Sequence, residues 1–157
     1  MAASDSGLPE NPYNPLAWII GEPTIGAGTW VGAFTVIDGS GGLTIGEGCD
    51  IASGVHIYTH SSALRCVSGR DYPSVDRAPV VIGDRVFIGA HAVINMGVTI
   101  GDECVIGAGS VVTADVPARS VIVGIPGRVS GRVDLSQPEI PRISSVTDVN
   151  RSDRGFE

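Results

Sequence analysis

Residues 82–112 read IGDRVF IGAHAV INMGVT IGDECV IGAGSV V, with an aliphatic residue opening every block of six. The same period runs through two earlier stretches, residues 25–37 and 45–57. The twelve units that carry it begin at Ile25, Val31, Ile37, Ile45, Ile51, Ile57, Ile82, Ile88, Ile94, Ile100, Ile106 and Val112. A fixed short period of this length is typical of a solenoid, in which each unit is one short strand and the stacked copies bury a continuous core.

The other positions of the unit fit a strand followed by a sharp corner. Glycine follows the aliphatic residue in seven of the twelve units, and glycine tolerates the positive φ that such corners need. Two places before each new aliphatic residue stands a small or β-branched residue, as in Thr35, Val55 and Ala92, which forms a second inward column. We therefore expect two or three residues of strand in each unit.

This pattern resembles the hexapeptide-repeat acyltransferases, in particular the sugar O- and N-acetyltransferases of the maltose and galactoside type. The resemblance covers about residues 18–130. It implies an all-β fold, a left-handed parallel β-helix solenoid of about four to five triangular coils with three strands in each. The left hand is taken from the resemblance, because general chirality rules favour the opposite hand.

The residues over which the sixfold repeat extends determine the domain boundaries that we expect. We expect an N-terminal segment over residues 1–17, the β-helix over residues 18–132, and a polar, mobile tail over residues 133–157. The period breaks twice, and insertions in solenoids map to corners on one face. The first break adds two residues around Gly39–Gly42, and the second, over about residues 61–79, is expected to form one long projecting loop.

The composition of the chain limits its expected cellular location and its expected binding partners. The length of 157 residues fits one domain. No apolar run approaches the roughly 18 residues of a membrane span, and residues 1–17 show no secretory signal. We therefore expect a cytoplasmic protein without membrane insertion. The net charge of −7 argues against nucleic acid as a partner. Three cysteines cannot all pair, and Cys49 and Cys104 fall in the inward column, so we expect buried structural thiols.

The stacking of the coils predicts which residues lie next to one another in space. Units three apart are expected to lie about 4.8 Å from one another. The units that share one side of the triangle then begin at Ile37, Ile57, Ile94 and Val112. Both breaks fall at the corner after this side, and there His60 is expected close to Asp38, Ser40 and Asn95.

His60 is the candidate catalytic residue. It stands at the mouth of the long loop, and the pair Thr59-His60 resembles the element that carries the general base in hexapeptide acetyltransferases of the sugar type. Family members often have proline after this histidine, where this chain has Ser61. The resemblance implies that His60 accepts the proton of the acceptor. Asp38, Ser40 and Asn95 are the candidates for binding that acceptor.

The other two histidines suggest a different chemistry. A γ-type carbonic anhydrase has a related β-helix and holds zinc with three histidines, so this chain would need His56, His60 and His91 together. In that family one histidine precedes a later close pair, whereas here the close pair comes first. We therefore expect no metal, and we interpret His56 and His91 as surface or subunit-contact residues.

A coenzyme A segment is implied near the end of the repeat. The run from Ile106 to Thr113, followed by Gly124-Ile125-Pro126-Gly127-Arg128, resembles the family segment in which backbone groups hold pantetheine and a basic residue meets phosphate. The matching positions are Ala90, Ala108, Thr113 and Arg128. Family members often have lysine after the threonine, where this chain has Ala114, so Arg119, Arg128 and Arg132 all remain candidates for the phosphate contact.

The resemblance implies an enzyme that moves acetyl from acetyl-CoA to a hydroxyl or amine of a sugar or sugar nucleotide, as in polysaccharide biosynthesis. A non-catalytic β-helix scaffold or assembly subunit is the alternative, since solenoids also serve as plain binding surfaces. A homotrimer is expected, because a helix of four to five coils is small and the outward residues Trp30, Val36, Phe87 and Val93 need cover.

Overall fold

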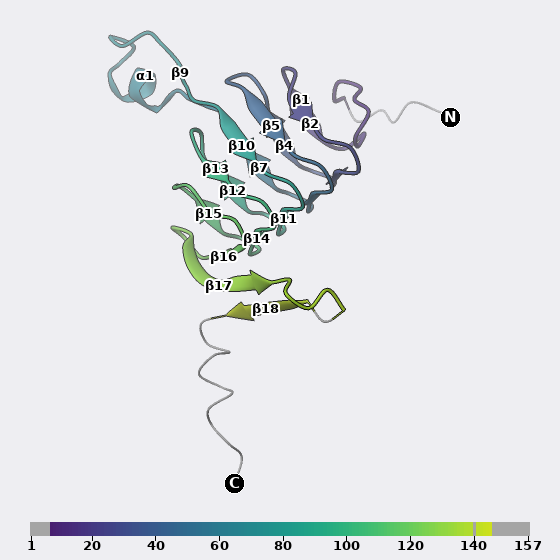
Figure 1. Cartoon of the computed structure of the whole chain (residues 1–157). Helices are drawn as coiled ribbons and strands as arrows, with labels where there is room; N and C mark the ends of the chain where they lie inside the picture. The colour runs from purple at the N-terminus through teal and green to yellow at the C-terminus, as the bar shows by residue number, and fades with distance from the viewer. Residues whose placement is uncertain (1–6, 140, 146–157) are drawn as a thin grey trace.

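The structure, a computed structural model, describes residues 7–139 and 141–145, and it confirms the left-handed parallel β-helix of about five coils (Figure 1). Three parallel sheets form the sides of the helix. Sheet A contains β1 (Trp18–Ile20), β4 (Val36–Asp38), β7 (His56–Ile57), β12 (Val93–Ile94) and β15 (Val111–Val112). Sheet B contains β2 (Thr24–Ile25), β5 (Leu43–Ile45), β10 (Val80–Ile82) and β13 (Thr99–Ile100). The parallel part of sheet C contains β3 (Trp30–Val31), β6 (Asp50–Ile51), β11 (Phe87–Ile88), β14 (Val105–Ile106) and β16 (Ser120–Val123).

The strand register confirms the expected stacking. In sheet A, Ile37 pairs with Ile57, and Ile94 pairs with both Ile57 and Val112. Both breaks of the period lie where the chain passes from sheet A to sheet B, which we call the AB corner (residues 39–42, 58–79, 95–98 and 113–115). Placed at a corner, the insertions leave the strands on either side in register.

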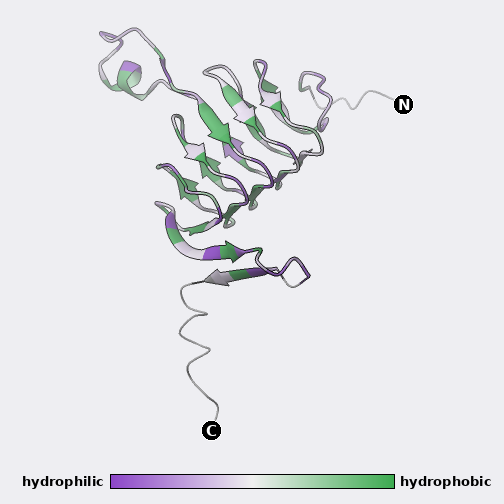
Figure 2. Ribbon diagram, viewed as in Figure 1, coloured by the Kyte–Doolittle hydropathy of each residue, from purple (hydrophilic) through white to green (hydrophobic). Residues whose placement is uncertain are grey.

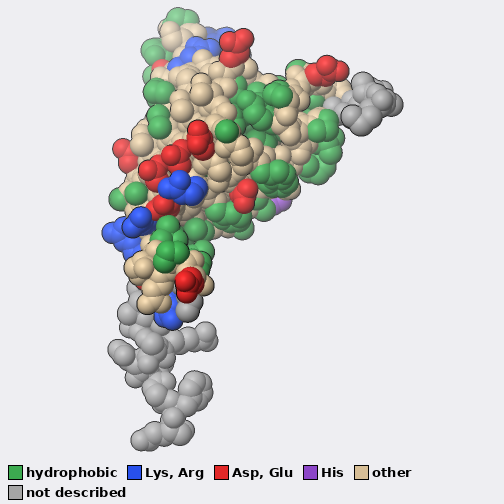
Figure 3. Space-filling model, turned by 45° about the vertical axis from the view of Figure 1, so that its right-hand side comes forward, with side chains coloured by type: hydrophobic (Ala, Val, Ile, Leu, Met, Phe, Trp, Pro, Cys, Tyr) green, Lys and Arg blue, Asp and Glu red, His purple; other side chains and the backbone are tan. Residues whose placement is uncertain are grey.

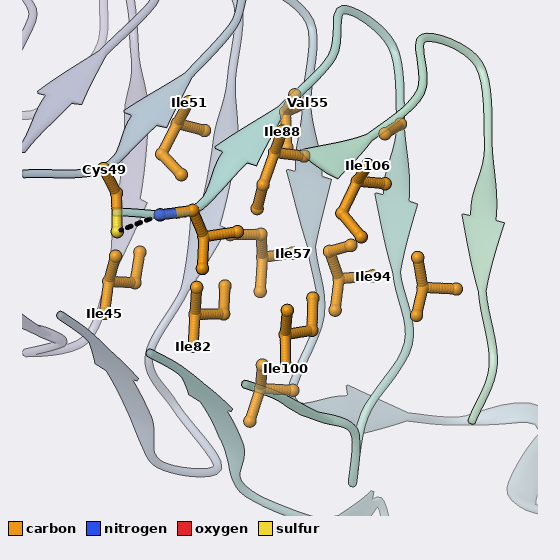
Figure 4. Close-up of a cluster of buried hydrophobic side chains, with 14 of the residues drawn as sticks. Ile45, Cys49, Ile51, Val55, Ile57, Ile82, Ile88, Ile94, Ile100 and Ile106 are labelled. Carbon is orange, nitrogen blue, oxygen red and sulfur yellow. Dashed lines mark hydrogen bonds between the residues drawn. The ribbon is translucent and has the colours of Figure 1, made fainter. Parts of the chain in front are cut away.

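The core is a set of stacked isoleucines (Figure 4). Those that are fully buried are Ile37, Ile45, Ile51, Ile57, Ile82, Ile88, Ile94, Ile100 and Ile106. Each such side chain contributes about 1.5–3 kcal/mol through burial. Hydrophobic and hydrophilic residues alternate along the winding chain because apolar side chains point inward and polar ones outward (Figure 2).

The two inward cysteines belong to the same core. Cys49 and Cys104 are buried free thiols, as expected, and burial raises the pKa of both. The Cys49 thiol donates to the Gly83 carbonyl oxygen at 3.2 Å, and its sulfur accepts the Val86 N–H at 3.4 Å (Figure 4). These contacts fit structural thiols rather than reactive ones.

The segment before the first strand closes the end of the helix. The side-chain amide of Asn14 donates to the Val31 carbonyl oxygen at 3.1 Å, and that of Asn11 donates to the Ala17 carbonyl oxygen at 3.1 Å. Ala17 is fully buried as part of the core. This segment is therefore bonded to the first coil of the helix.

The second break of the period forms the expected projecting loop (Figure 1). It begins at β8 (His60–Ser61), continues through the short helix α1 (Ala63–Val67) and returns through β9 (Asp76–Arg77). Strands β8 and β9 pair antiparallel, so a two-stranded ribbon forms the base of the loop. Among the described residues, the only helix is this single turn, which is far too short to cross a membrane.

The expected tail requires a correction. Strand β17 (Arg128–Asp134) turns back antiparallel to β16, and β18 (Arg142–Ser145) pairs antiparallel with β17. Part of the segment after residue 132 therefore extends sheet C, because antiparallel strands need only a short connection and no repeat. Residues 140 and 146–157 lie outside the described residues, so the prediction of a mobile tail stays a prediction there.

Large aromatic side chains are exposed on the first coils. The exposed fraction is 48% for Trp18, 54% for Trp30, 68% for Phe34 and 44% for Phe87. Trp18 points outward from sheet A, Trp30 and Phe87 from sheet C, and Phe34 lies at the corner between those two sheets. Figure 3 shows hydrophobic side chains gathered along the right-hand flank, towards the N-terminal end. We call these four residues the aromatic flank.

Candidate active site

The AB corner joins a histidine to a buried carboxylate. Asp38 ends β4, and His60 lies one coil further along, three residues after the end of β7. The His60 Nδ1 atom lies 2.6 Å from the Asp38 Oδ2 atom. The His60 side chain is 36% exposed, whereas that of Asp38 is 0% exposed. One partner of the pair therefore faces solvent while the other lies inside the corner.

Hydrogen bonds occupy both carboxylate oxygens of Asp38. Its Oδ1 accepts the Ser40 N–H at 2.9 Å, and its Oδ2 accepts the Thr59 N–H at 2.8 Å and the Thr59 hydroxyl at 2.9 Å. Burial alone would raise the pKa of Asp38, but the hydrogen bonds from Ser40, Thr59 and His60 outweigh it and hold the pKa well below its ordinary value. Asp38 is therefore ionised at neutral pH.

The glycines of the first break permit this arrangement. The Gly41 N–H donates to the Thr59 hydroxyl oxygen at 2.8 Å, and this bond joins two adjacent coils. A Cβ atom at Gly41 would collide with the Thr59 carbonyl oxygen, so only glycine allows the backbones to approach this closely. Thr59 itself is fully buried and contacts both Asp38 and Gly41.

The pairing determines which ring nitrogen of His60 is free. An ionised carboxylate can only accept, so His60 places its proton on Nδ1 and donates it to Asp38. The neutral ring then carries its lone pair on Nε2. With a third of the side chain exposed, this nitrogen is able to accept a proton from a molecule at the corner.

The structure brings His60, Asp38 and Ser40 together and places Asn95 on the next coil at the same corner, but it gives Asp38 a different place from the one expected. We expected Asp38 to bind an acceptor, yet its carboxylate is fully buried and is taken up by Ser40, Thr59 and His60. Ser40 and Asn95 are exposed on the coils before and after His60, where they are able to contact a ligand. Thr59 was missed as a site residue, and its position next to His60 is the only signal that pointed to it.

The three histidines do not converge within the chain. His56 points outward from sheet A, where its Nδ1 atom lies 3.2 Å from the Tyr58 hydroxyl. The His91 ring lies over Gly54 at the corner between sheets C and A. Across residues 7–139 and 141–145, no group of three or more His, Cys, Asp or Glu side chains is placed to hold a metal ion.

The four expected cofactor residues lie at the two borders of sheet A. Ala90 and Ala108 are neighbours at the corner between sheets C and A, where the Gly109 N–H donates to the Ala90 carbonyl oxygen at 2.9 Å. Thr113 lies at the AB corner, directly after β15. Arg128 begins β17, and the preceding Gly127 donates its N–H to the Val111 carbonyl oxygen in β15 at 2.7 Å.

The three candidate arginines differ in their partners. Arg119 forms an ion pair with Glu103, at 2.6 Å between its Nε and a carboxylate oxygen. Arg132 donates to the Ala118 carbonyl oxygen at 3.4 Å. Arg128 donates to the neighbouring Gly127 carbonyl oxygen at 3.1 Å and forms no ion pair among the described residues. Of the three, only Arg119 is paired with an acidic residue, so Arg128 and Arg132 are both available to an anionic ligand.

Comparison with known proteins shows that much of the β-helix consists of a known repeat. A family model described as the hexapeptide repeat of succinyl-transferase matches residues 24–59 and 79–114. A serine acetyltransferase of Mycobacterium tuberculosis is 39% identical over 114 residues, which is 71% of this chain and 45% of that protein. The chain thus spans less than half the length of this relative.

Two solved structures extend the comparison. A maltose O-acetyltransferase from Clostridium difficile is 31% identical with a TM-score of 0.62, and the match covers 75% of this chain and 67% of that one. A hexapeptide-repeat acetyltransferase from Vibrio cholerae, complexed with acetyl coenzyme A, is 35% identical with a TM-score of 0.62, and the match covers 74% and 60% of the two chains.

The buried carboxylate leads to a prediction about stability. Asp38→Asn removes the charge that accepts from Thr59 and His60, so it is expected to lower the free energy of unfolding at pH 7 by about 1–3 kcal/mol. Because the folded-state pKa of Asp38 is depressed, the difference from wild type should be full above the ordinary value of 3.8 and shrink as the pH falls below it. Urea unfolding at pH 7, 5 and 3.5 measures this.

The matched control is Asp71→Asn, which changes an exposed aspartate of the projecting loop. It is expected to leave the free energy of unfolding within about 0.5 kcal/mol of wild type at all three pH values. Equal stability of wild type and Asp38→Asn at pH 7 would contradict the assignment of Asp38 as an ionised, hydrogen-bonded carboxylate.

Proposed function

Since the chain belongs to the hexapeptide-repeat acyltransferases, we propose that it transfers the acetyl group of acetyl-CoA to a hydroxyl or amine of a sugar or sugar nucleotide. The observation that carries this proposal is the pair of His60 and Asp38 at the AB corner. A histidine whose Nδ1 is held by a buried carboxylate, and whose side chain is 36% exposed, is an arrangement suited to general-base catalysis.

The chemistry follows from the tautomer of His60. The acceptor oxygen or nitrogen attacks the thioester carbonyl carbon as Nε2 takes its proton, and Asp38 stabilises the imidazolium that forms. When the tetrahedral intermediate collapses, the carbon–sulfur bond breaks and the Nε2 proton goes to the departing thiolate. A base placed in this way contributes about 10²- to 10⁴-fold to the rate.

Ser40 and Asn95 support the acceptor site. Both side chains are exposed, and they lie at the AB corner on the coils that flank His60. Hydroxyl and amide groups are able to donate and accept hydrogen bonds, as recognition of sugar hydroxyls requires. In this proposal Asp38 acts on the acceptor only through His60 and is therefore a positioning residue.

Acetyl-CoA is proposed to lie along the borders of sheet A. Ala90 and Ala108 offer backbone groups beside small side chains at one corner, and Thr113 offers a hydroxyl at the other. Arg128 supplies the cation for a CoA phosphate, because it has no acidic partner among the described residues and directly follows Gly127, which donates its N–H to the Val111 carbonyl oxygen of sheet A. The relative from Vibrio cholerae with acetyl coenzyme A bound supports this choice of donor.

We further propose that the chain forms a homotrimer. The aromatic flank supports this, since Trp30 and Phe87 are about half exposed on the outward face of sheet C, and large exposed apolar side chains mark a candidate interface. The other two outward residues that we expected to need cover, Val36 and Val93, are only half-buried in a single chain. A copy that covers sheet C would bury Trp30 and Phe87, and a copy that covers sheet A would bury Val36 and Val93.

His60→Ala is expected to lower kcat for acetyl transfer by about 10²-fold or more while coenzyme A still binds, because the imidazole acts on the acceptor proton. Thiol release from acetyl-CoA and calorimetric titration of coenzyme A measure the two effects. His91→Ala is the control, and it should keep kcat near the wild-type value. A near-normal kcat in His60→Ala would place the base elsewhere, and the absence of any coenzyme A binding by wild type would favour the scaffold.

Arg128→Ala is expected to weaken coenzyme A binding about tenfold or more, because a charge-assisted hydrogen bond to phosphate is worth about 1.5–3 kcal/mol. Calorimetry on the folded variant measures the change in Kd. Arg119→Ala, which removes an arginine already paired with Glu103, serves as the control and should leave Kd unchanged. The assignment fails if Arg128→Ala binds with the wild-type affinity.

The molar mass in solution is expected to be three times the 16.1 kDa of one chain at micromolar concentration. Trp30→Glu should shift the mass towards the monomer, because it places a charge in the proposed interface. Thr44→Glu, which changes an exposed residue on the outward face of sheet B, should leave the mass unchanged. Light scattering after size exclusion distinguishes these results, and a monomeric wild type would rule the trimer out.

A further inference from the structure

A cation lies directly across from the proposed base. In the ribbon at the base of the projecting loop, β8 and β9 pair antiparallel, with His60 opposite Arg77 and Ser61 opposite Asp76. Directly opposite residues of an antiparallel pair have Cβ atoms about 4.5–5.5 Å apart on the same face of the ribbon. The guanidinium of Arg77 and the imidazole of His60 therefore leave the ribbon on one side.

The backbone around Arg77 is anchored to the β-helix. The Ala78 N–H donates to the Thr59 carbonyl oxygen at 3.1 Å, so the residues that follow Arg77 and precede His60 are bonded to one another. A Cβ atom built on Gly97 would lie 3.4 Å from the Ala78 side chain, which places the returning strand against the coil that carries Asn95. The position of Arg77 is thus set by the solenoid and not by the tip of the loop.

Arg77 has no acidic partner among the described residues. Its side chain is exposed, and its one side-chain hydrogen bond is a long one of 3.5 Å to the Val75 carbonyl oxygen. The adjacent Asp76 accepts from the Tyr72 hydroxyl at 2.8 Å, and Asp38 is buried beneath His60. The charge of Arg77 is therefore available to a molecule that approaches His60.

We propose that Arg77 determines acceptor specificity by binding a carboxylate or phosphate group of the acceptor. This inference rests on the proposed acetyl transfer at His60 and narrows its substrate class to anionic acceptors. A guanidinium binds either group through two parallel hydrogen bonds, which also orients the acceptor. The chain as a whole carries a net charge of −7, which repels anions, so an anionic acceptor needs a local cation beside the base.

The test compares acceptors that differ in one anionic group. Galactose with galacturonate forms the carboxylate pair, and glucosamine with glucosamine 6-phosphate forms the phosphate pair. Wild type is expected to show a kcat/KM at least tenfold higher for the charged member of at least one pair, and the pair that shows it identifies the group bound. Arg77→Gln should remove this preference mainly by raising KM for the charged member, and Arg77→Lys should restore part of it.

Arg70→Gln is the matched control, since it removes an exposed arginine of the same loop that does not lie opposite His60. It should leave the preference unchanged. The inference is overturned if wild type acetylates both members of each pair equally well, or if Arg77→Gln lowers kcat/KM for neutral and charged members by the same factor.

Failure of the proposed function gives a different result. In that case wild type acetylates none of the four compounds, and Arg77 is then tested by calorimetric titration of the same compounds into the protein saturated with coenzyme A. Tighter binding of the charged member that is lost in Arg77→Gln supports the anion site without any turnover. Equal binding of charged and neutral members overturns it.

Discussion

The stacked isoleucines constrain every other feature of this molecule. Their side chains point inward from strands of two or three residues, so a shift of one residue within a strand would turn an isoleucine outward and lose its burial. The chain can therefore change length only where no inward side chain is needed, which is at a corner. Both insertions lie at the same corner, and there they supply the glycines beside Asp38 and the ribbon that carries His60.

Burying the carboxylate of Asp38 costs free energy, and the hydrogen bonds of the AB corner offset that cost. Asp38 is fully buried, and an unpaired charge there would be strongly destabilising. Ser40, Thr59 and His60 together supply its hydrogen bonds, and Gly41 lets the backbone come close enough for Thr59 to take part. The bonds that stabilise the charge also hold the imidazole in one orientation, so the stability of the corner and the positioning of the proposed base have the same physical origin.

The sequence was sufficient to predict which coils meet, but not which way a side chain at a corner points. The sixfold period predicts that the residues after Ile37, Ile57 and Ile94 are neighbours, and the pairing of the strands confirms it. Asp38 was expected to face an acceptor, because a period says nothing of the extra turn that directs it inward. Strand β18 and the register of Arg77 have no periodic signal at all, since both depend on antiparallel pairing between segments outside the repeat.

The shape of the AB corner bears on how the proposed reaction is enclosed. A corner of a triangular helix is convex, so a single chain can present His60 and Arg77 but cannot surround a substrate with them. A thioester and an acceptor need both orientation and protection from water, which requires a second wall. The projecting loop offers part of that wall, because its base is the ribbon that carries both residues. The rest has to come from another surface, and an exposed aromatic flank on a small solenoid suits the assembly that would supply it.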